Sequence, residues 1–135
     1  MKVTELMIND WVSINDSNFQ VKVIKKNGVI KLYENTKFGE HEINFNSDYI
    51  EEFIQPIPLT PEILEKNGYK FNYLYYEKEG YPAIELGSKK GIYNIGKVYF
   101  SDDGDPDIHV YTSCQYVHEL QHVLKICGIE KEIIV

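Results

Sequence analysis

The chain has few of the residues that mark the best-known functional classes. Only two of its 135 residues are cysteines, Cys114 and Cys127, which is too few for a disulfide framework or a four-cysteine zinc site. We therefore expect both to be buried and reduced. No window approaches about 18 consecutive apolar residues, and the first ten residues lack the apolar stretch of a secretion signal. These absences predict a cytoplasmic protein without a membrane span.

Positive charge is also scarce. The chain has 14 basic and 21 acidic residues, a formal net charge of -7, and its lysines are scattered in pairs such as Lys25 with Lys26. Proteins that grip nucleic-acid phosphates need clustered lysine and arginine, so nucleic-acid binding is not expected. A modest acidic excess usually serves solubility, although an acidic mimic of DNA, acting as an inhibitor, stays an alternative.

The usual catalytic patterns are missing as well. The sequence contains no glycine-rich phosphate loop, no nucleophile elbow around a serine and no cysteine with a partnered base. We therefore expect no enzymatic activity and no cofactor. One motif, H-E-x-x-H in the last helix, offers an alternative to this expectation.

What the sequence does contain is the composition of a folded protein, with 43% hydrophobic and 26% charged residues. Residues 1–58 read as five short strands that alternate apolar and polar positions, with Phe19, Val21 and Val23 on one face. The dipeptide Asn27-Gly28 predicts a tight hairpin turn. We expect this segment to form an SH3-like small β-barrel.

Residues 59–135 predict a helix, an antiparallel meander and a second helix. Thr60 and Pro61 favour a helix start, and Gly68 favours its end. Strands follow over 69–112, with the acidic stretch 101–107 as a solvated turn. A helix over 115–127 then precedes a possible final strand. The predicted fold is α+β, mostly β, with both regions packed as one compact unit.

The last helix contains the motif H-E-x-x-H at His118, Glu119 and His122. Two histidines four apart can bind zinc from one helical face, while the glutamate activates a zinc-bound water. A minimal zinc-dependent hydrolase is therefore an alternative function. Against it, no third ligand has the expected spacing, and a helical wheel places His118 and His122 opposite the apolar side that includes Cys127. The favoured interpretation is a polar, solvated helix face.

Aromatic residues offer a different candidate site. In the stretch from Tyr69 to Tyr81, strand alternation places Tyr73 and Tyr75 on one face and Tyr76 on the other. Tyrosine left exposed on a sheet is typical of protein-binding surfaces, and tyrosine covering a thin sheet is the equal alternative. The single tryptophan, Trp11, is predicted to plug the barrel, with a ligand-stacking role as its alternative.

Three stretches resemble a known family. ELMINDWV, IQPIPLTPEILEKNGY and YVHELQHVLKICGIEKEI are similar, in this order, to signature stretches of a family of small proteins of Bacteroides-group bacteria and their phages and prophages. The matching pattern covers His118, Leu120 and Gln121, whereas it requires neither Glu119 nor His122. The resemblance implies a phage or mobile-element setting, and it implies no particular mechanism because the family carries no established activity.

Together these observations favour a non-enzymatic, cytoplasmic interaction module. We expect it to be an accessory protein of a phage or a mobile element. Its candidate partner-binding residues are Tyr73, Tyr75, Tyr76 and Trp11, and its expected partner is another protein. Open sheet edges in the second half also leave a homodimer as an alternative.

Overall fold

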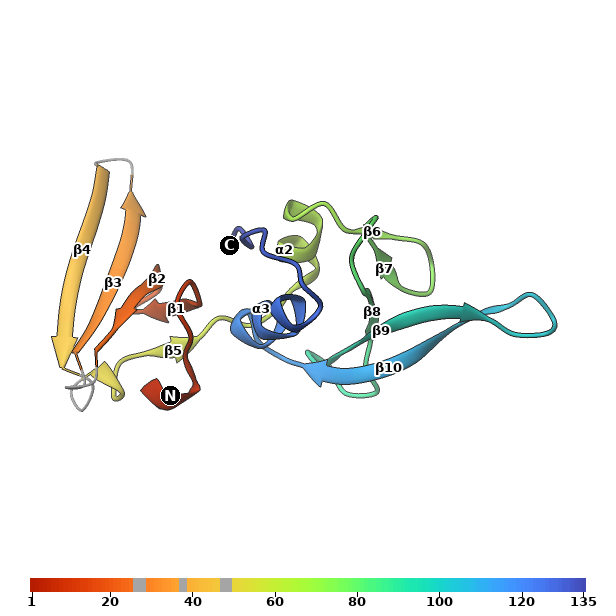
Figure 1. The fold of residues 1–135 in the computed structure, drawn as a ribbon, viewed down its shortest axis with the longest axis horizontal. Coiled ribbons are helices and arrows are strands. Elements are labelled where there is room, and N and C mark those ends of the chain that lie inside the picture. Colours follow the sequence, from red (N-terminus) through yellow and green to blue (C-terminus); the bar gives the residue numbers. More distant parts are fainter. Residues whose placement is uncertain (26–28, 37–38, 47–49) are drawn as a thin grey trace. The chain divides into compact units, whose positions relative to one another are not determined.

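A computed structural model describes residues 1–25, 29–36, 39–46 and 50–135 (Figure 1). The chain divides into two compact units, Met1–Ile57 and Pro58–Val135. As predicted, the fold is α+β and mostly β, and the described residues form one antiparallel sheet in each unit and the two α-helices α2 and α3. No helix among the described residues has the length and apolar character needed to cross a membrane. The expected packing of the two units together stays a prediction.

The first unit is built on a five-stranded sheet. A short 3-10 helix, Val3–Glu5, precedes β1 (Trp11–Ile14), β2 (Ser17–Ile24), β3 (Val29–Thr36), β4 (Gly39–Asn46) and β5 (Gln55–Pro56). The strand order is β4-β3-β2-β1-β5, so the last strand returns to the side of the first. No pairing between the described parts of β4 and β5 closes the sheet, so a closed SH3-like barrel is not confirmed.

Alternation along these strands forms the core of the first unit. Phe19 and Val21 are buried as predicted, whereas Val23 is only half-buried beyond a bulge in the pairing with β3. The β1–β2 turn uses Asn15 and Asp16, both with positive φ, as two-residue hairpins require. The predicted Asn27-Gly28 turn lies outside the described residues. The buried core residues of this unit are Leu6, Val12, Phe19, Val21, Ile30, Leu32, Ile50 and Ile54.

The second unit combines two helices with a second antiparallel sheet. In chain order it contains α2 (Pro61–Lys66), β6 (Lys70–Phe71), β7 (Tyr76–Glu77), β8 (Ala83–Leu86), β9 (Tyr93–Phe100), β10 (Pro106–Cys114) and α3 (Val117–Ile126). The sheet order β10-β9-β8-β7-β6 is the predicted meander. Figure 1 shows β9 and β10 continuing beyond the other strands as a two-stranded ribbon.

The ends of α2 follow from its sequence. Thr60 Oγ1 accepts a hydrogen bond from the backbone N–H of Ile63, at 3.3 Å, and Pro61 opens the helix. Gly68 then ends it with a φ of 88°, in the left-handed region that glycine enters without strain. All three predictions for this helix are confirmed.

The predicted final strand is wrong. Residues 129–135 form no strand, although Ile133 is buried. Instead, the side chain of Asn67 donates to the carbonyl of Ile134 at 2.7 Å and accepts from its N–H at 2.8 Å. The tail therefore satisfies its backbone at the end of α2, by a side-chain contact that strand periodicity does not predict.

Candidate functional site

The H-E-x-x-H motif lies on α3, but its first histidine is not solvated. His118 is 5% exposed, with its ring stacked 6.0 Å from that of Tyr116, and the His122 ring is 5.7 Å away at a steep angle. The predicted solvated histidine face is therefore wrong for His118. Cys127, placed on the apolar side by the helical wheel, is exposed instead, while Cys114 is buried as expected.

Glu119 caps the helix on which it lies. Its Oε2 atom accepts hydrogen bonds from the backbone N–H groups of Gln115, at 2.6 Å, and Tyr116, at 3.1 Å. These groups belong to the start of a helix, where N–H donors have no partner within the helix. The carboxylate that a zinc hydrolase would use as its general base is thus directed into a capping interaction.

No third metal ligand joins the two histidines within the part of the chain that the structure describes. That part contains no group of three or more histidine, cysteine, aspartate or glutamate side chains able to hold a metal ion. Catalytic zinc sites need three protein ligands and an open position. The arrangement of His118, Glu119 and His122 therefore resembles a capped, partly buried helix start more than a metal centre.

The tyrosine-rich stretch is interrupted by a turn. Strands β6 and β7 are only two residues long each, and Asn72 accepts the N–H groups of Leu74 and Tyr75 between them. Tyr73, at a φ of 81°, is 94% exposed, whereas Tyr75 and Tyr76 are 8% and 6% exposed. The prediction that the three tyrosines alternate along one strand is wrong, and only Tyr73 lies at the surface.

Trp11 is half-buried at the start of β1, where it pairs with Gln20 of β2. The core residues of this strand pair are the neighbouring Val12 and Phe19, so alternation places Trp11 on the other face of the sheet. Its candidate role in partner binding stays a prediction.

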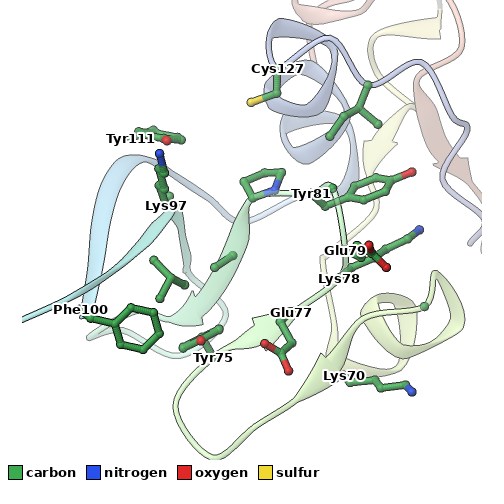
Figure 2. Close-up of a pocket in the computed structure, with 17 residues that line it drawn as sticks. Lys70, Tyr75, Glu77, Lys78, Glu79, Tyr81, Lys97, Phe100, Tyr111 and Cys127 are labelled. Carbon is green, nitrogen blue, oxygen red and sulfur yellow. The ribbon is translucent and has the colours of Figure 1, made fainter. Parts of the chain in front are cut away.

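A hollow in the second unit lies beside the outer half of β9 (Figure 2). It has a volume of about 830 Å³ and is called the β9 hollow below. Lys97 and Val98 both line it, although successive residues of a strand point to opposite faces of a sheet. The hollow therefore borders the edge of β9 instead of lying on one face of the sheet.

The walls of the β9 hollow differ in chemistry. On one face, Tyr75, Ala83 and Val98 belong to a small apolar cluster that extends toward Phe100, which is 70% exposed. Figure 2 shows Lys97 and Tyr111 together on another side. Apolar contact area beside separated charges suits a polypeptide better than a small polar substrate.

The lysines around this hollow are not equivalent. Lys78 Nζ donates to the carbonyl of Asn67 at 2.7 Å and lies 4.1 Å from the centre of the Tyr81 ring, so it is held in place. Lys97 has no ion pair with the residues that the structure describes. Glu77 and Glu79 also line the hollow, which gives its rim charges of both signs.

Burial raises the pKa of two side chains in the second unit, and it makes neither of them reactive. Burial raises the pKa of the Cys114 thiol to about 12, with a smaller contribution from the charge of Glu119. Burial likewise raises the pKa of Tyr76. Both groups therefore stay protonated near neutral pH, so neither is an activated nucleophile.

Sequence reasoning missed the β9 hollow. It depends on β8 beginning only at Ala83, opposite Gly96, while β9 continues to Phe100. The one signal in the sequence is the run YNIGKVYF, whose apolar and aromatic pattern continues past a central glycine. Comparison with protein-family models, curated proteins and solved structures gives no match.

Proposed function

We propose that this chain is a non-enzymatic interaction module that binds an extended protein segment in the β9 hollow. The carrying observation is the hollow itself, which lies along a strand edge and joins apolar walls to a charged rim. Extended segments bind sheet edges through backbone hydrogen bonds, and alternate side chains then enter flanking hollows. This arrangement accounts for the exposure of Phe100 and Tyr111.

The same proposal replaces the earlier tyrosine surface with a new set of residues. Tyr75 contributes to the wall of the hollow, whereas Tyr76 is buried and Tyr73 lies on a separate turn. Phe100 and Lys97 are the residues expected to contact the bound segment. Tyr73 then serves as an exposed aromatic residue outside the site.

Selection of a displayed random-peptide library on the immobilised chain tests this function. Recovered peptides are expected to bind the wild-type chain and Tyr73→Ser with equal affinity, and to bind Phe100→Ser at least about tenfold more weakly. Loss of binding in Tyr73→Ser alone would move the site to the β6–β7 turn. Failure to recover any saturable binder would count against an interaction module.

We also propose a setting and a finer fold for the chain. The three stretches that resemble the Bacteroides-group family support its membership and a cytoplasmic role as a phage or mobile-element accessory protein. The return of β5 to the side of β1 supports an SH3-like barrel for the first unit. An experimental structure of Met1–Val135 in which β4 and β5 stay far apart would contradict the barrel.

A further inference from the structure

The backbone of β9 presents hydrogen-bonding groups at one open edge. Ser101 N–H donates to the Asp105 carbonyl at 2.9 Å, directly across from it at the end of the β9–β10 pair. Hydrogen-bonded pairs alternate along an antiparallel ladder, so Lys97 and Tyr99 also direct their N–H and C=O groups toward β10. Val98 and Phe100 therefore direct theirs away from β10.

The pairing of β9 with β8 also shows that Val98 and Phe100 direct their backbone groups away from β10. Gly87 N–H donates to the Ile92 carbonyl at 2.7 Å across the β8–β9 pair, so the even-numbered residues of β9 face β8. Strand β8 begins at Ala83, opposite Gly96. Within the described chain no strand therefore pairs with the outward backbone groups of Val98 and Phe100, and these groups border the β9 hollow.

The other edge of the ribbon is protected. Pro106 of β10 has no N–H, and the pairing of β10 shifts between Val110 and Thr112, as at a β-bulge. Proline and bulges are the devices by which natural sheets block pairing at an exposed edge. Neither device occurs at Lys97–Phe100, so β9 is the edge open to another strand.

This edge is complementary to itself. In an antiparallel pair with Tyr99 opposite Tyr99 of a second copy, Val98 of each copy lies opposite Phe100 of the other. The outward groups of both residues then form four hydrogen bonds. Each exposed Phe100 ring also covers Val98 and the apolar wall of the other copy.

The length of β9 before its turn and the charges beside it both fit this antiparallel register. The turn at 101–105, with Gly104 at a φ of 82°, reverses the second copy near the point where β8 begins. That turn carries Asp102 and Asp103, and in this register they approach Lys97 of the first copy. The acidic turn thus meets a lysine that has no ion pair with the described residues of its own chain.

We infer that two copies of this chain associate through the Lys97–Phe100 edge of β9 and form one continuous sheet across a twofold axis. The inference rests on the proposed function and names a second copy as the protein that occupies the β9 hollow. The short paired edge predicts a reversible dimer whose population rises with concentration.

Sedimentation equilibrium over a concentration series tests the dimer. The wild-type chain is expected to change reversibly from monomer to dimer. Phe100→Pro removes the outward N–H of residue 100 and leaves the hydrogen bonds to β10 in place. It should therefore weaken association at least about tenfold, and more than Phe100→Ser does, because Phe100→Ser keeps that N–H. Phe71→Ser alters an exposed aromatic residue outside the hollow and should leave association unchanged.

Exchanging the charges of Lys97 and of Asp102 and Asp103 distinguishes the loss of an intermolecular contact from misfolding of the variant. Lys97→Glu should weaken the dimer, and addition of Asp102→Lys and Asp103→Lys should restore it, because an unfolded chain cannot be rescued by two further substitutions. A chain that stays monomeric up to about 1 mM overturns the dimer. If that monomer still binds selected peptides that Phe100→Ser loses, the proposed function stands without the dimer; if it binds none, both fail.

Discussion

Gly96 of β9 lies so close to His109 of β10 that a Cβ atom at residue 96 would overlap the His109 carbonyl oxygen. The two strands change register at this level, where the pairing shifts between Val110 and Thr112. The ribbon that borders the β9 hollow begins at this close approach. A single glycine thus permits the geometry on which the candidate site depends.

Substitution of Gly96 should be strongly destabilising. In Gly96→Ala the new methyl group meets backbone atoms that cannot rotate away, and we expect the free energy of unfolding to fall by about 3 kcal/mol. Gly91→Ala is the matched control, because its Cβ meets nothing within 4 Å and its φ of 82° alone should cost about 1 kcal/mol. Equal losses in urea denaturation would contradict the close packing.

Glu119 should act through stability. Glu119→Ala removes the acceptor for two backbone N–H groups at the start of α3, and we expect a loss of about 1 kcal/mol. Glu119→Gln keeps an acceptor oxygen and should stay closer to the wild type. Denaturation midpoints of the three proteins measure this, and equal stability of Ala and wild type would count against capping.

Purified protein should contain well under one zinc ion per chain. The expectation follows from the capping role of Glu119 and from the missing third ligand among the described residues. Metal analysis of protein made without a chelator or a histidine tag measures the content, with His122→Ala beside it. Stoichiometric zinc that disappears in His122→Ala would restore the hydrolase alternative.

Cys114 should make stability fall at alkaline pH. Burial raises its folded pKa to about 12 from the ordinary 9.0, so above pH 9 the unfolded chain releases a proton that the folded chain keeps. Stability is therefore full below pH 9 and decreases by about 1.4 kcal/mol per pH unit from this group as pH rises toward 12. Cys114→Ala should have a shallower decline, and identical slopes would refute the assignment.

Tyr69 should tolerate loss of its hydroxyl. That oxygen is buried without a hydrogen-bond partner among the described residues, and the cavity beside it holds only about 10 Å³, at the lower limit for one water molecule. Tyr69→Phe should therefore unfold at the same or a higher denaturant concentration, with a gain of up to about 1 kcal/mol. A loss above that size would mean that the hydroxyl has a partner.

Some features of this protein were predictable because their causes are local. Thr60, Pro61 and Gly68 define α2 through hydrogen bonds and φ values that depend on residues a few positions away. The meander of the second unit follows from turn residues between alternating segments. The acidic stretch at 101–107 likewise turns back between β9 and β10 at Gly104.

The candidate site was not predictable, because it depends on contacts between distant residues. Alternation assigned Tyr75 and Tyr76 to opposite faces, but the turn at Asn72 buried both. The spacing of His118, Glu119 and His122 is equally compatible with a metal site and with a helix cap, and the backbone groups within reach of Glu119 distinguish the two.

The sequence by itself determined the α+β class, the ends of α2 and the order of strands in the meander, since propensities and turn chemistry act over a few residues. Tertiary structure alone decided that the pairing of β9 with β8 stops at Gly96 while β9 continues to Phe100. Strand length and register are set by which backbone groups find partners across the sheet. The open edge and its hollow therefore exist only once the sheet has formed.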